Sequence, residues 1–108
     1  MIMNDYSNKF KELETSIVKW ALEKGILSKG TPTGQAEKTI EEAQEILNAI
    51  KVNDRVEIAD GIGDTLVTLI IQSHMQNLNI IDCLEQAYST IVNRTGKMIN
   101  GVFVKDDQ

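Results

Sequence analysis

The chain is poor in the residues that define several classes of protein. It has one cysteine, which excludes an internal disulfide and a zinc site built from several cysteines. It has one histidine, which is too few for the Glu-x-x-His pairs of a di-iron bundle. The first residues lack the charged and then apolar pattern of a signal peptide, so we expect no such leader. The longest apolar stretch, 66–71, falls far short of the roughly 20 residues that a membrane helix needs.

Basic residues are fewer than acidic ones. The 108 residues include 11 Lys and Arg against 16 Asp and Glu, which gives a formal net charge of −5. A negative chain is repelled by nucleic acids and by anionic membranes, so we expect neither as a partner. Together with the missing leader and membrane span, this composition predicts a small, soluble, cytoplasmic protein with a single domain over residues 1–108.

Apolar residues recur at the spacing of three and four that is typical of helices. The pattern predicts four helices, at about 6–24, 33–51, 54–78 and 79–93. Asp54 and Asn79 stand where N-cap residues are favoured, ahead of the third and fourth helices. The only proline and a cluster of glycines predict a loop near residues 25–33. Gly96 ends the fourth helix, and we expect an irregular tail from about residue 97.

Short connections between the predicted helices make neighbouring helices antiparallel. We therefore predict an all-α fold, a small antiparallel bundle of about four helices. The third helix is apolar nearly all round at Leu66 to Ile71, which indicates a mostly buried helix. A chain of this length buries only a modest core, so we expect that association into a homodimer or homotetramer completes it.

Carboxylates are concentrated on the second and third predicted helices. Those of the second are Glu41, Glu42 and Glu45, and those of the third are Glu57, Asp60 and Asp64. A rotation of about 100° per residue sets each group on a face away from the apolar stripe of its helix. In an antiparallel hairpin Glu45 lies about level with Asp60, and Glu42 with Asp64. The two acidic faces are therefore predicted to meet.

Two acidic faces in contact repel each other unless a cation lies between them. Carboxylate oxygens without His or Cys suit Mg²⁺, or Mn²⁺, rather than zinc. Gly61 and Gly63 indicate a close approach of backbone, side chain or ligand, because each costs about 1 kcal/mol relative to alanine within a helix. The alternative is a solvated acidic surface, since Glu is common on exposed helices.

The order of these motifs resembles the all-α nucleotide pyrophosphohydrolases of the MazG type. The pattern is Glu41-Glu42-x-x-Glu45, then Glu57-x-x-Asp60 and Gly63-Asp64. Trp20, the loop after it and then Gln35-x-x-Lys38 look like the family's entry into its metal helix. The segment 94–105 is similar to the ends of small phage-type members.

The resemblance implies Mg²⁺-dependent hydrolysis of a nucleoside triphosphate, expected to be a dNTP, to a nucleoside monophosphate and pyrophosphate. The implied metal ligands are Glu42, Glu45, Glu57, Asp60 and Asp64. On the third helix the ligand pair is either Glu57 with Asp60 or Asp60 with Asp64. Glu41 or Glu42 is expected to take the proton of the attacking water.

The resemblance also implies residues that contact the substrate. Lys38, Arg94 and Lys97 are expected to bind the phosphates, because these need cations from the protein. Trp20 is expected to stack on the base, and Gln35 to contribute to substrate binding. Each has a structural alternative: Trp20 packs in the core, Gln35 is only a first-turn residue, and Arg94 and Lys97 stabilise a helix C-terminus.

Two further functions stay open from the sequence. One is a phosphoribosyl-ATP pyrophosphohydrolase, which performs the same chemistry on a modified nucleotide. The other is a non-catalytic helical module for dimerisation, regulation or nucleotide sensing, whose acidic faces are only solvated or hold a metal without turnover.

Overall fold

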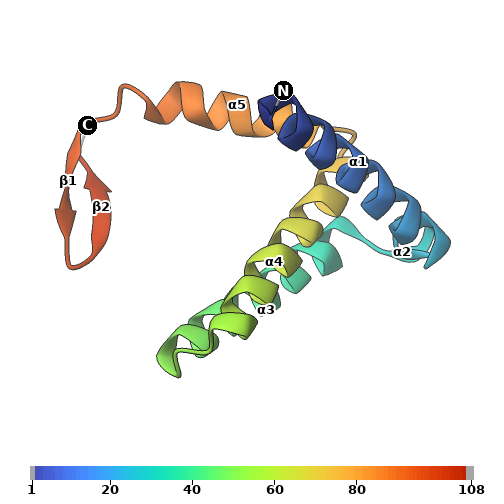
Figure 1. Cartoon of the computed structure of the whole chain (residues 1–108), viewed down its shortest axis with the longest axis horizontal. Helices are drawn as coiled ribbons and strands as arrows, with labels where there is room; N and C mark the ends of the chain where they lie inside the picture. The colour runs from blue at the N-terminus through green and yellow to red at the C-terminus, as the bar shows by residue number, and fades with distance from the viewer. Residues whose placement is uncertain (1, 107–108) are drawn as a thin grey trace. The chain divides into compact units, whose positions relative to one another are not determined.

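The computed structural model describes the backbone of residues 2–106 and the side chains of residue 6 and residues 8–106. Within these residues the chain is helical apart from one small sheet, which confirms the all-α class (Figure 1). The elements are α1 (Ile2–Glu23), α2 (Ile26–Lys29), α3 (Pro32–Lys51), α4 (Arg55–Met75), α5 (Ile80–Ile91), β1 (Gly96–Ile99) and β2 (Val102–Lys105). Contacts divide them into two units, one up to Leu78 and one from Asn79 on, and each is described by itself. No helix in the described part of the chain has the length and apolar character to cross a membrane.

The helices begin at residues that satisfy their first backbone N–H groups. Asp54 accepts a hydrogen bond from the N–H of Glu57 at 3.1 Å, as predicted for the start of α4. Asn79 accepts two bonds from the first turn of α5, at 2.8 and 3.2 Å. The hydroxyl of Thr31 accepts a bond at 3.0 Å from the first turn of α3, which begins with Pro32.

Two segments that were expected to be irregular contain regular structure. The predicted loop at 25–33 holds the single turn α2. The tail forms an antiparallel hairpin in which Ile99 pairs with Val102. Asn100 and Gly101 connect the strands with positive φ values of 49° and 85°, as a type I′ turn requires. An Asn-Gly pair between apolar residues is the sequence signal of such a hairpin, so the expectation of an irregular tail was wrong.

In the first unit, α3 and α4 pack along each other as an antiparallel hairpin (Figure 1). A Cβ on Gly61 would lie 2.7 Å from Cγ1 of Ile46, so the helices can approach closely there because Gly61 has no side chain. Further along, the hydroxyl of Thr39 donates a hydrogen bond to that of Thr68 at 2.8 Å. These two contacts fix the position of one helix along the other.

The face of α3 that packs against α4 is not its most apolar face. That face carries Gln35, Thr39, Glu42, Ile46 and Ala49, which are buried or half-buried. The apolar stripe is open instead: Ile40 is 70% exposed, and Leu47 and Ile50 are also exposed. Glu42 is 7% exposed, so the acids do not all lie opposite the apolar stripe as predicted. The packed face lies between the apolar and the acidic faces.

The helix α1 also packs against α4 in the first unit. The buried apolar residues of the described chain are Ala21, Ala49, Ile70 and Ile71. Leu66 and Leu69 of α4 are exposed, so this helix is less buried than its apolar composition predicted. The single chain therefore encloses a small core and leaves much apolar surface open.

Candidate functional site

The register of α3 against α4, meaning which residues lie opposite each other, places the acids of both helices on one flank of the hairpin. Glu45 and Asp60 each precede a residue of the close contact between Ile46 and Gly61. Each is therefore rotated by about 100° from the contact within its own helix, and in antiparallel helices that rotation leads to the same side. We call this side the acidic flank, consisting of Glu41, Glu42, Glu45, Glu57, Asp60 and Asp64.

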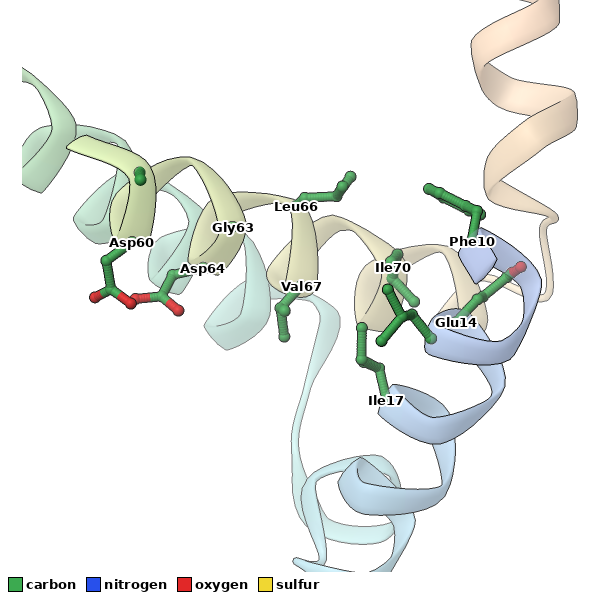
Figure 2. Close-up of a pocket in the computed structure, with 11 residues that line it drawn as sticks. Phe10, Glu14, Ile17, Asp60, Gly63, Asp64, Leu66, Val67 and Ile70 are labelled. Carbon is green, nitrogen blue, oxygen red and sulfur yellow. The ribbon is translucent and has the colours of Figure 1, made fainter. Parts of the chain in front are cut away.

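Pairs of these acids share hollows at the surface of the first unit. Asp60 and Asp64 line a cleft between α1 and α4, and Figure 2 shows their carboxylates on the same side of α4. Glu45 and Glu57 line another hollow together with Asn48, near the turn of the hairpin. Asp60 with Asp64, and Glu57 with Asp60, both remain available as ligand pairs. The choice between them stays a prediction.

The donor set of the acidic flank fits a hard divalent cation. Every candidate ligand is a carboxylate, and Mg²⁺ and Mn²⁺ prefer oxygen ligands. Within the described residues, no three His, Cys, Asp or Glu side chains converge closely enough to hold a metal ion. Like charges without a cation between them keep apart. Metal binding would therefore have to draw the carboxylates together from both helices.

Lys38 is paired with both candidate bases. Its Nζ lies 3.5 Å from Oε1 of Glu41 and 3.5 Å from Oε2 of Glu42. The negative charge of Glu41, the hydrogen bond to that carboxylate and the charge of Glu42 raise the pKa of Lys38 above 10.5. Lys38 therefore stays protonated at neutral pH and supplies the counter-charge that the buried Glu42 carboxylate requires.

Two predicted substrate contacts lie elsewhere in the first unit. The amide Nε2 of Gln35 donates a hydrogen bond to the backbone oxygen of Thr68 at 3.2 Å, so this side chain links α3 to α4. Trp20 lies on α1 and is 46% exposed, which leaves much of its ring accessible. It is not among the side chains that line the cleft beside Asp60. Stacking of Trp20 on a base stays a prediction.

The two remaining predicted residues belong to the second unit. Arg94 follows α5 and lines a hollow with Thr95 and Lys105, a cation that was not among the predicted phosphate contacts. Lys97 is exposed on β1, where it pairs with Val104 of β2. Their binding to phosphate stays a prediction.

The sequence reasoning also missed the cleft between α1 and α4, which we call the α1–α4 cleft. It encloses about 410 Å³. Its α1 wall consists of Phe10, Leu13, Glu14 and Ile17. Three of these residues belong to the apolar stripe of the first predicted helix, and such a stripe indicates burial without showing what lies opposite. No local motif marks the cleft, because it arises only where the two helices meet.

Comparison with known proteins identifies the family to which the chain belongs. The MazG nucleotide pyrophosphohydrolase domain matches residues 31–99, which is more than half of the chain. The chain therefore belongs to the MazG family of nucleotide pyrophosphohydrolases. The matched span contains the whole acidic flank, whereas α1 lies outside it. No curated protein and no solved structure matches the chain.

Proposed function

We propose that the protein hydrolyses a nucleoside triphosphate, in particular a dNTP, to a nucleoside monophosphate and pyrophosphate with Mg²⁺ as cofactor. The observation that carries the proposal is the acidic flank: carboxylates from two helices lie on one side of a hairpin, inside the span that matches the MazG domain. The family supplies the class of reaction, and the flank supplies residues able to perform it. Because its substrates are intracellular nucleotides, we place the enzyme in the cytoplasm.

The acidic flank supplies the metal ligands of the proposal. The residues that would hold Mg²⁺, or Mn²⁺ in its place, are Glu42, Glu45, Glu57, Asp60 and Asp64. When bound, the ion would neutralise phosphate charge and lower the pKa of a bound water. Carboxylates from both helices are needed for this, so the hairpin contact between Ile46 and Gly61 determines how closely the ligands can approach.

The reaction breaks the anhydride between the α- and β-phosphates. The oxygen of water bonds to phosphorus, the bridging bond breaks and pyrophosphate leaves. Glu41 or Glu42 accepts the proton of the water in the proposed step. The Glu41 side chain is 65% exposed and that of Glu42 is 9% exposed, and both pair with Lys38. In the proposal, the one of these two carboxylates that does not hold the metal acts as the base.

Cations and an aromatic ring are the further substrate contacts that we propose, each for its own unit of the chain. Lys38, Arg94 and Lys97 would bind phosphate oxygens, since each carries a positive charge. Trp20, with its accessible ring, would stack on the base. Gln35 would contribute chiefly by holding α3 against α4 through its bond to Thr68.

We also propose that the protein is a homodimer or a homotetramer. The apolar stripes of α3 and α4, which include the exposed Ile40, Leu47 and Ile62, lie on the side of the hairpin away from the acidic flank. A second copy that covers this side would leave the flank open. Replacing Ile62 with Lys should shift sedimentation equilibrium toward the monomer, whereas a wild-type protein that is monomeric at micromolar concentration would contradict this part of the proposal.

The test of the activity is pyrophosphate release from a panel of NTPs, dNTPs and phosphoribosyl-ATP, with Mg²⁺ and with a chelator. We expect metal-dependent release that Glu45→Gln and Asp60→Asn each abolish while the circular dichroism spectrum stays helical. Glu37→Gln is the matched control, because Glu37 is exposed on α3 but lies outside the acidic flank. This control should retain full activity.

Three results would change the conclusion. Full turnover in both Glu45→Gln and Asp60→Asn would remove the acidic flank from the mechanism. Binding of nucleotide with metal but without turnover would identify a sensor. Preference for phosphoribosyl-ATP would identify a phosphoribosyl-ATP pyrophosphohydrolase, which performs the same chemistry on a modified nucleotide.

A further inference from the structure

The helix α5 carries an open apolar stripe, which we call the α5 stripe. Its side chains are between 46% and 66% exposed: Ile81, Leu84, Tyr88 and Ile91. A rotation of about 100° per residue places all four within an arc of about 80°, and the acids of α5 lie outside that arc. The spacing of three, four and three residues is that of the a and d positions of a coiled coil. The α5 stripe is therefore an uncharged surface suited to packing against another helix.

The second unit needs a surface outside itself to become stable. None of residues 79–106 is buried, and only Ile80 and Cys83 are half-buried. A helix of 12 residues and a two-stranded hairpin are each only marginally stable alone in water. The stability of this unit must therefore come from apolar surface that is covered by something else.

The hairpin that follows α5 enlarges the open apolar surface of the second unit. The end of β2 lies beside the last turn of α5, because Thr90 and Lys105 line one hollow. Five apolar side chains of the two strands are between 42% and 64% exposed: Met98, Ile99, Val102, Phe103 and Val104. A standard interface takes about 800 Å² from each partner, over roughly 20–30 residues. Residues 79–106 match one side of such an interface in size and in apolar content.

The partner that the α5 stripe fits is the same stripe on a second copy of the chain. Side chains at a and d positions of one helix enter holes between those of a facing helix with the same spacing. Every copy carries the stripe at the same positions, so a two-fold axis brings two stripes together. A partner such as nucleic acid is disfavoured, because the stripe offers no charge to its phosphates.

We propose that α5 is a second self-association surface, through which two copies pair stripe to stripe. The proposal rests on the proposed function in one respect, the pairing of two copies through the apolar side of the α3–α4 hairpin. That side carries the exposed Ile40, Leu47 and Ile62, so each unit of the chain presents an apolar surface of its own. Two different two-fold interfaces on one chain close a tetramer. The α5 stripe therefore selects the homotetramer from the two assemblies proposed above.

The experiment is sedimentation equilibrium of the full chain at micromolar concentration. Wild type should be a tetramer, and Leu84→Lys, which places a charge in the middle of the stripe, should reduce it to a dimer. Ile62→Lys should also give a dimer, because it removes the other interface, and the double variant should be a monomer. Leu84→Ser serves where Leu84→Lys does not fold, and Tyr88→Glu should repeat the result. Gln86→Lys is the matched control, since Gln86 is exposed on the opposite side of α5.

The outcomes separate this proposal from the proposed function. A tetramer that persists in the variants of Leu84 and Tyr88 overturns the role of α5, and so does a wild-type dimer that only Ile62→Lys dissociates. A wild-type dimer that only the variants of Leu84 and Tyr88 dissociate supports the α5 stripe and overturns the pairing through α3 and α4. A wild-type monomer overturns both interfaces. Pyrophosphate release is measured separately, and its absence from a wild-type tetramer would overturn the proposed reaction without affecting the α5 stripe.

Discussion

Replacing Gly61 with alanine tests the contact that sets the α3–α4 hairpin. The new Cβ would lie 2.7 Å from Cγ1 of Ile46 and 3.6 Å from its Cα and backbone nitrogen. Relief requires the Ile46 side chain to leave its rotamer or the two helices to move apart. Overpacking of this kind costs about 1–3 kcal/mol. Alanine also has a higher helix propensity than glycine, and this gain of about 1 kcal/mol offsets part of the cost.

Gly63→Ala provides the reference for this prediction, because its Cβ meets nothing within 4 Å. It gains the same propensity of about 1 kcal/mol without the overpacking. The free energies of unfolding of the two variants, from urea titration at one protein concentration, should differ by about 1–3 kcal/mol, with Gly61→Ala the less stable. Equal stability would refute the close contact. The double variant with Ile46→Ala should be more stable than the sum of the single changes predicts, because it removes Cγ1.

Three further predictions follow from the described contacts. Asp54→Ala should lower the free energy of unfolding by about 1 kcal/mol, since it removes the cap on the N–H of Glu57; no change in urea denaturation would contradict the cap. On the alkaline side, stabilisation from the Lys38 pairs should be present up to pH 10.5 and disappear as the pH rises through the raised folded pKa of Lys38, so the difference in stability between wild type and Lys38→Met should shrink above pH 10.5. Mg²⁺ with a non-hydrolysable dNTP should raise the melting temperature, and a chelator should reverse the increase; an unchanged melting temperature would contradict binding at the acidic flank.

The helices and their starts could be predicted from the sequence because their signals are local. The apolar spacing within each helix, and the caps at Asp54 and Asn79, depend on residues within a turn or two. The predicted level of Glu45 with Asp60 agrees with the contact between Ile46 and Gly61, because a short turn leaves an antiparallel hairpin little freedom of register. The hairpin at Asn100 is also marked by a local signal, the Asn-Gly pair between apolar residues.

The sequence by itself determined which residues share a face of each helix, because a period of 3.6 residues depends only on backbone geometry. Only the tertiary structure decided which neighbour covers each face. It placed the polar side of α3, with Thr39 and Glu42, against α4 and left the more apolar Ile40 open. It also formed the α1–α4 cleft from helices whose contacting residues are about 50 positions apart in the sequence. Burial depends on the packing of distant segments, and the spacing of apolar residues along one helix contains no information about its partner.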